Sequence, residues 1–171
     1  AKEQNLKNIQ AINCELDKVP DYFEKLRFDL IMSSYAVYYS RNIVKLLSSL
    51  STILNKNGQM FICGYGKGTN QELNEIINKV VEKKYIQAQM EDFIGEKEIA
   101  IIGTHYSTLK ISRLANQIYF DSPDKLFRWW KNHNSFVPEV STQVFELIKN
   151  HFQATECFSL SKNVLGIQFI K

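Results

Sequence analysis

Two groups of residues in this sequence carry side chains that suit the binding or conversion of a small molecule. Tyr38 and Tyr39 follow a short apolar segment, and loops after buried strands often carry binding sites. Trp129, Trp130 and His133 lie close together at helical spacing, and an imidazole can exchange a proton near neutral pH. We predict that His133 is a base or a ligand contact. We also predict that Tyr38, Tyr39, Trp129 and Trp130 belong to the same binding site.

Each residue of the second group has an alternative role. Trp129 and Trp130 are adjacent on the predicted helix and point about 100° apart. Either one lines a cleft and the other lies in the core, or both lie in the core. His133 also fits an exposed position near the helix end, where its charge complements the helix dipole. His105 is a second candidate for a base.

The sequence carries no pattern for metal or phosphate binding. Cys14, Cys63 and Cys157 are far apart and have neither the spacing of metal ligands nor that of a disulfide framework. We therefore expect no metal site and reduced thiols in a cytoplasmic protein. Gly64–Gly68 is rich in glycine but lacks the spacing and the Lys-Ser/Thr end of a phosphate-binding loop, so it favours a flexible connection.

A strand–helix–strand unit must position Tyr38 and Tyr39. Phe28–Ser33 is a predicted strand whose continuous apolar run indicates burial on both faces. The next helix has its apolar residues on one side, and Asn57–Gly58 is typical of a helix end. Gln59–Tyr65 is the second strand. Two strands joined by a helix form a right-handed crossover, so the sequence predicts an α/β fold with a parallel sheet.

The remaining predicted elements flank this unit. Glu96–Tyr106 fits a helix or a buried strand, and we favour the helix. Alternation in Thr108–Leu114 and in Ile118–Phe120 predicts a hairpin with its turn between them. The others are a helix tail in residues 2–10, a strand at Ala11–Cys14, a helix opened by a capping box at Thr69–Glu72, a helix starting at Ser122–Asp124, a helix after Pro138 and a strand at Val164–Ile170.

Composition and charge narrow the class of protein. The 171 residues, 44% hydrophobic and 23% charged, are typical of one globular domain over residues 1–171. The net charge of +3 comes from scattered lysines and arginines, without the basic stripe that nucleic-acid binding requires. The sequence shows no apolar run of membrane-spanning length and no signal peptide. We therefore expect neither a nucleic acid nor a membrane as partner.

The chain from residue 5 to 66 resembles a class I S-adenosylmethionine-dependent methyltransferase of the small-molecule type. Asp29 opens the apolar strand, Ser33 and Ser34 close it, and aromatic residues follow, in the order of that family. The resemblance implies a Rossmann-like, mostly parallel sheet with flanking helices and an antiparallel C-terminal strand. It also suggests that residues 85–136 cover the substrate.

The resemblance implies S-adenosylmethionine as cofactor and matches residues to it. Glu15 is matched to an acidic residue that accepts a hydrogen bond from the adenine amino group, and the Leu16 N–H to a contact with the adenine ring. Ser33, Ser34 and Tyr35 are matched to the loop beside the sulfonium and the methionine part. Glu15 stands where the family carries aspartate, so it also fits a solvated loop acid.

The implied reaction is methyl transfer to an oxygen, nitrogen or carbon atom of a small-molecule acceptor that the sequence does not identify. The sulfonium is already activated, so positioning and exclusion of water supply most of the catalysis. Tyr38 and Tyr39 are matched to the acceptor side of the site. We add Trp129 and Trp130 as acceptor contacts and His133 as the base.

One departure from the family concerns its glycine-rich cofactor loop. No strand with a G-x-G loop lies upstream, and Gly58 is the first glycine, so we expect a sheet that is incomplete at its N-terminus. A missing N-terminal segment or a homo-oligomer would complete it, and without either we expect this chain to be inactive. Two alternatives stay open: a non-catalytic remnant acting as a binding or assembly module, and an α/β enzyme of another class, such as a nucleotide-dependent transferase.

Overall fold

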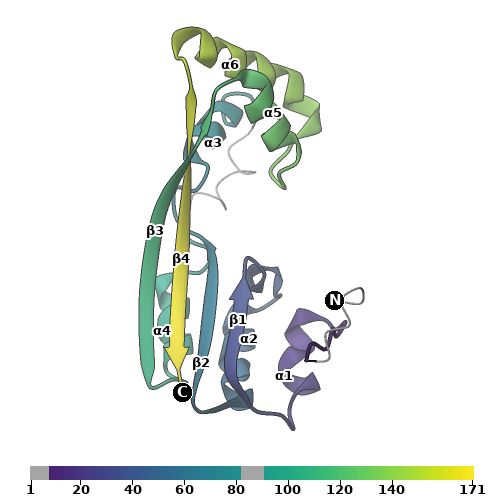
Figure 1. The fold of residues 1–171 in the computed structure, drawn as a ribbon, viewed down its shortest axis with the longest axis vertical. Coiled ribbons are helices and arrows are strands. Elements are labelled where there is room, and N and C mark those ends of the chain that lie inside the picture. Colours follow the sequence, from purple (N-terminus) through teal and green to yellow (C-terminus); the bar gives the residue numbers. More distant parts are fainter. Residues whose placement is uncertain (1–7, 82–90) are drawn as a thin grey trace.

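The computed structural model describes residues 8–81 and 91–171, and its centre is a four-stranded sheet (Figure 1). The strand order is β1–β2–β4–β3. β1 and β2 are parallel, whereas β4 runs antiparallel to both β2 and β3. The Rossmann-like α/β fold with flanking helices and an antiparallel C-terminal strand is thus confirmed. The strands are β1 (Phe28–Ser34), β2 (Leu54–Tyr65), β3 (Thr108–Phe120) and β4 (Phe158–Ile170).

Helix α2 (Ile43–Leu50) joins β1 to β2 and makes the predicted parallel crossover. The Asn42 side chain caps its first turn by accepting a hydrogen bond of 2.9 Å from the Lys45 N–H. Leu46 and Leu50 are buried on its inner face, as their spacing predicts. The crossover places the carboxyl ends of β1 and β2 at the same edge of the sheet.

The other helices are short. Every helix in the described ranges has too few apolar residues in a row to cross a lipid bilayer. The helices other than α2 are η1 (Leu16–Lys18), α1 (Val19–Tyr22), η2 (Val37–Tyr39), η3 (Ser51–Ile53), α3 (Gln71–Ile77), α4 (Glu96–Gly103), α5 (Pro123–Lys131), η6 (Pro138–Val140) and α6 (Ser141–Ala154).

Two hydrophobic cores share the long β3–β4 ladder (Figure 1). The first core lies between α2, α4 and the sheet, and it contains Leu47, Ile102 and Ile167. The second core lies where α3, α5 and α6 gather around the other end of β3 and β4, and it contains Trp130 and Ile148. The ladder therefore connects the crossover unit to the helices of the second half of the chain.

The region before and along β3 confirms one prediction and corrects another. Glu96–Gly103 is helix α4, as favoured from the sequence. The predicted hairpin is wrong, because β3 continues without a turn. Ala115, Asn116 and Gln117 pair with Asn163, Lys162 and Ser161 of β4. β4 has the same length as β3 and pairs with the whole of it through backbone hydrogen bonds. This pairing outweighs the local tendency to form a turn.

Three predictions about the start of the chain are also wrong. β1 is not buried on both faces: Leu30 and Met32 are 53% and 69% exposed. Their side chains lie on the face opposite Ile31, which packs against the first core. Ala11–Cys14 is not a strand, since no strand among the described residues pairs with it. Residues 8–10 are not helical, and the rest of the predicted helix tail lies outside the described residues.

Asn57 does not end a helix as predicted. Helix α2 stops at Leu50, and η3 leads directly into β2. Asn57 has the expected left-handed backbone, with φ of +66°, but it lies inside β2, where the register with β1 is irregular. The asparagine therefore bends a strand rather than terminating a helix.

The prediction of a capping box before α3 is wrong as well. Asn70 is the residue that precedes the helix, and its φ is +59°. The Thr69 hydroxyl donates a hydrogen bond of 2.6 Å to the Asn163 carbonyl. Glu72 accepts hydrogen bonds from the N–H and the hydroxyl of Ser161. Both side chains are thus bonded to β4 instead of to the helix end.

Candidate functional site

A cavity of about 330 Å³ lies at the carboxyl ends of β1 and β2, where α/β sheets commonly bind ligands. We call this cavity the tyrosine cavity, and segments that are distant in the sequence meet in its wall. Its lining consists of Tyr35, Tyr38 and Tyr39 from the loop after β1, Tyr65 from the end of β2, Thr69 and Asn70 from the next loop, His133 and Asn134 after α5, and Lys162 on β4.

The turn after β1 directs the tyrosines into the cavity wall. Tyr35 has φ of +53°, a left-handed conformation that is uncommon for an aromatic residue. Its N–H donates a hydrogen bond of 2.8 Å to the Cys63 carbonyl on β2. The chain then enters η2, which carries Tyr38 and Tyr39. Backbone strain of this kind is concentrated at binding sites.

Tyr38 is the centre of an aromatic cluster. Its ring centroid lies 4.8 Å from that of Tyr39, 5.1 Å from that of Tyr65 and 6.4 Å from that of Phe93. Burial, assisted by the neighbouring Tyr39, raises the pKa of Tyr38 to about 12. Burial also raises the pKa of Tyr35 and of Tyr65. These hydroxyls are therefore neutral near pH 7 and can donate or accept hydrogen bonds.

His133 lines the cavity from the segment after α5, with its ring stacked on Trp129 at a centroid distance of 4.8 Å. The Ser135 N–H donates to His133 Nδ1 at 3.2 Å, and the Ser135 hydroxyl lies 2.7 Å from the same atom. A backbone N–H can only donate, so the proton of the neutral ring is on Nε2. Burial, followed by the charge of Lys162, lowers the pKa of His133 and keeps the imidazole neutral near pH 7.

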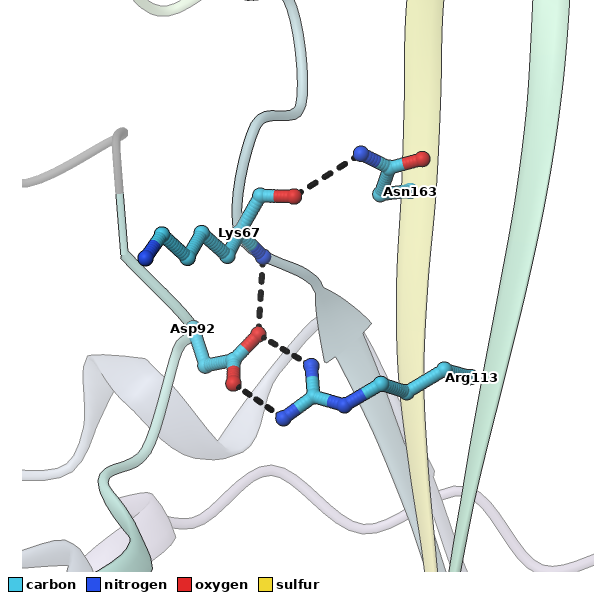
Figure 2. Close-up of polar contacts among 4 residues, drawn as sticks. All are labelled: Lys67, Asp92, Arg113 and Asn163. Carbon is cyan, nitrogen blue, oxygen red and sulfur yellow. Dashed lines mark hydrogen bonds and ion pairs between the residues drawn. The ribbon is translucent and has the colours of Figure 1, made fainter.

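An ion pair holds the loop between β2 and α3 (Figure 2). Arg113 on β3 donates two hydrogen bonds, of 2.8 and 2.7 Å, to the two carboxylate oxygens of Asp92. Asp92 also accepts a hydrogen bond of 2.7 Å from the Lys67 N–H, and the Asn163 side chain donates one of 2.8 Å to the Lys67 carbonyl. We call these four residues the Asp92 clamp. The clamp fixes the start of the loop that carries Thr69 into the cavity wall.

Of the two predicted adenine contacts, Glu15 lies beside a second cavity. Glu15 lines this cavity, also of about 330 Å³, together with Asp17 and Arg41. Leu16 is half-buried and packs against the first core. The Ser40 hydroxyl and the Arg41 N–H both donate hydrogen bonds to the Asp17 carboxylate, and these bonds lower the pKa of Asp17. The turn at Glu15 is thereby tied to the loop that follows the tyrosines.

The structure places the predicted site residues in different surroundings. Trp129 lies behind His133, and Ser33 and Ser34 end β1 as half-buried and exposed residues. Trp130 is fully buried in the second core, and its indole N–H donates a hydrogen bond of 3.2 Å to the Ser135 carbonyl. It therefore does not contact a methyl acceptor in this structure. His105 is exposed and lines neither cavity. The predicted residues in the tyrosine cavity are Tyr35, Tyr38, Tyr39 and His133.

Sequence reasoning missed several residues of the cavity wall. Tyr65 ends the strand next to β1, so the rule that sites lie at carboxyl ends of strands was sufficient to find it. Asn70 and Lys162 carry no local signal, since only the pairing of β4 brings them to the cavity. Within residues 8–81 and 91–171, no three His, Cys, Asp or Glu side chains form a group suited to a metal ion.

Comparison with known proteins supports the same class of fold. A protein of Bacillus halodurans described as a methyltransferase and the YcgJ protein of Bacillus subtilis each align with a TM-score of 0.59 at 14% identity. Each alignment covers 99% of this chain and 74% of the other. An Anabaena variabilis protein described as a methyltransferase of antibiotic biosynthesis aligns with a TM-score of 0.56 at 7% identity, over 94% and 73%. No curated protein sequence matches.

The fold and the cavity at the strand ends define a Rossmann-like α/β protein with a ligand site. The family model for the methyltransferase domain matches residues 1–133, which is most of the chain. This protein therefore belongs to the methyltransferase domain family.

Proposed function

We propose that this protein transfers the methyl group of S-adenosylmethionine to a small molecule bound in the tyrosine cavity. The observation that carries the proposal is the position of that cavity at the carboxyl ends of β1 and β2. Tyr35 belongs both to the cavity wall and to the segment Ser33–Tyr35 that is matched to the cofactor. Donor and acceptor would therefore share Tyr35 as a common wall.

The residues matched to the cofactor fit its chemistry. Glu15 is an exposed carboxylate beside a cavity, and it can accept a hydrogen bond from an amino group. Asp17 ties the Glu15 turn to Ser40 and Arg41, in the loop after the tyrosines. Ser33 and Ser34 supply hydroxyls at the end of β1. These positions support binding of the adenine and methionine ends.

The chain contributes mainly positioning and exclusion of water. When bound, the cofactor supplies an activated methyl group, whose C–S bond breaks with its electron pair left on sulfur while the acceptor forms the new bond to carbon. The tyrosine rings cover apolar parts of an acceptor, and their neutral hydroxyls orient it. His133 suits a hydrogen-bond donor at Nε2 better than a base, because its unprotonated Nδ1 already accepts from Ser135.

Two measurements on the full chain test this function. Calorimetry with S-adenosylhomocysteine is expected to show saturable binding. Incubation with a methyl-labelled donor and a protein-free small-molecule extract is expected to place label in small molecules. Absence of cofactor binding, or label found in protein alone, would refute the proposal.

A matched pair of variants assigns the reaction to the cavity. Tyr39 is 70% exposed in the cavity wall, and Tyr119 is 66% exposed on β3 outside it. Tyr39→Ala is expected to slow methyl transfer about tenfold with unchanged affinity for S-adenosylhomocysteine, because it loosens the acceptor only. Tyr119→Ala is expected to change neither. Equal effects of the two substitutions would place the acceptor elsewhere.

A non-catalytic assembly module is the second candidate function. Leu30 and Met32 favour it, since they expose apolar surface on one face of β1. Such a module would self-associate through this face without binding the cofactor. Light scattering separates the two functions: association that Met32→Ser abolishes, in a chain that does not bind S-adenosylhomocysteine, would favour the module.

A further inference from the structure

Lys162 introduces an unbalanced charge into the tyrosine cavity. It is the only charged residue in the cavity lining formed by the described residues, and no carboxylate belongs to that lining. Its side chain is half-buried, and burial lowers its pKa. A cation in such a position normally has an anionic partner, because partial burial removes part of its hydration.

The contacts of Lys162 are neutral. Its ammonium donates one hydrogen bond, of 2.6 Å, to the Asn70 side-chain oxygen, and it lies 4.4 Å from the ring centroid of Trp129. An ammonium has three donors, so two have no partner among the described residues. Among the described residues Glu72 forms no ion pair with Lys162; its carboxylate accepts hydrogen bonds from the N–H and the hydroxyl of Ser161.

The position of the ammonium is fixed before any ligand arrives. Asn70 is 4% exposed and has a left-handed backbone conformation. Its N–H donates a hydrogen bond of 2.8 Å to the Ser161 carbonyl, which ties it to β4. Trp129 is held in turn by its stacking on His133. A cation that is fixed in place loses little conformational entropy when it binds an anion, so it favours such a ligand.

We propose that the acceptor bound in the tyrosine cavity carries a carboxylate that pairs with Lys162. This inference rests on the proposed function, in which the cavity holds the acceptor. His133 Nε2–H is a second donor to the same group, because Ser135 occupies Nδ1. One cation balances the single charge of a carboxylate, whereas a phosphate dianion would remain half compensated. A cavity of about 330 Å³ with a tyrosine wall suits an aromatic or short-chain acid.

The test measures binding of three probes, each with one phenyl ring, to the full chain without a methyl donor. The probes are benzoate, neutral benzamide and phenyl phosphate, each titrated by ligand-observed NMR. Benzoate is expected to bind the unaltered protein at least about tenfold more tightly than benzamide, as a charge-assisted hydrogen bond requires. This comparison needs no variant, so it does not depend on how any substitution folds.

Lys162→Met is expected to remove the preference for benzoate, because methionine keeps the apolar stem and deletes the charge. Lys110→Met is the matched control, since Lys110 is exposed on β3 outside the cavity lining, and it is expected to keep the preference. Circular dichroism checks that both variants are folded.

Three results of the binding measurements would overturn the carboxylate assignment. They are equal or absent binding of benzoate and benzamide, a preference that survives Lys162→Met, and tighter binding of phenyl phosphate that Lys162→Met abolishes. The last result would assign a phosphate in place of the carboxylate. Methyl transfer to neutral acceptors alone would refute this inference and leave the proposed function standing. A Lys162-dependent benzoate preference without binding of S-adenosylhomocysteine would refute the proposed function and leave a carboxylate site that does not hold a methyl acceptor.

Discussion

Breaking the Asp92 clamp is expected to destabilise the protein more than breaking an exposed ion pair. Asp92 is 17% exposed and Arg113 is 54% exposed, and two short parallel hydrogen bonds join them. Exposed pairs contribute about 0.2–1 kcal/mol, and hydrogen bonds to charged groups contribute about 1.5–3 kcal/mol. A bidentate pair with one half-buried partner falls between these ranges, so we expect a coupling free energy of about 1–2 kcal/mol.

A double-mutant cycle measures this coupling. It compares Arg113→Met, Asp92→Asn and the double variant by urea unfolding at pH 7 and low salt. The control cycle uses Lys125 and Asp121, whose side chains are 63% and 71% exposed and whose charged atoms lie 2.7 Å apart. This (i, i+4) pair is expected to give about 0.3–0.5 kcal/mol. A clamp coupling no larger than that of the control would refute the reasoning.

The same cycle has a defined pH dependence. The Arg113 hydrogen bonds lower the pKa of Asp92 below its ordinary value of 3.8 in the folded state. A lowered carboxyl pKa contributes stability above the unfolded value and loses it as the pH falls through the folded value. The clamp coupling is therefore expected to be constant from neutral pH to just above 3.8 and to disappear below that. A coupling that disappears near neutral pH would point to another group.

Three further changes test packing and titration. Trp130→Ala removes a fully buried ring and is expected to lower the free energy of unfolding by about 3–5 kcal/mol in urea, and a loss below about 1 kcal/mol would contradict its core position. Tyr106→Phe deletes a hydroxyl that donates a hydrogen bond of 2.8 Å to the Leu47 carbonyl, and it is expected to lower the free energy of unfolding by about 1–2 kcal/mol in the same measurement. An unchanged free energy of unfolding would contradict that hydrogen bond. Burial lowers the pKa of His133 below 6.5, so its contribution to stability is present above pH 6.5 and is lost as the pH falls through the folded value. His133→Gln is expected to flatten the fall in Tm between pH 7 and about pH 5.

Local periodicity was sufficient to predict the crossover unit. The spacing of Leu46 and Leu50 fixes which face of α2 is buried, and the apolar segments on either side fix β1 and β2. From that unit follow the carboxyl ends of the strands and the position of Tyr38 and Tyr39 in a cavity wall. These features depend on residues that are neighbours in the chain, so the sequence alone determined them.

The local signals misled where a distant partner decided the outcome. Ala115 and its neighbours have the composition of a turn, yet β4 pairs with them along an uninterrupted β3. Glu72 has the spacing of a helix cap, yet Ser161 takes its carboxylate. Leu30 belongs to an apolar run that predicts burial on both faces, yet its side chain lies on the face opposite the first core. In the first two cases a contact across the fold outweighed a preference of less than about 1 kcal/mol per residue, whereas the Leu30 side chain stays exposed because it points away from that core.

The sequence by itself determined the family, the crossover and the tyrosines that follow β1. Only the tertiary structure showed that Trp130 is a core residue while Trp129 lies behind the site. It alone brought Lys162 of β4 to Asn70 and His133 in the wall of the same cavity. The physical reason is that a helical or strand period is encoded within a few residues, whereas the environment of a charged side chain depends on which distant segments pack around it.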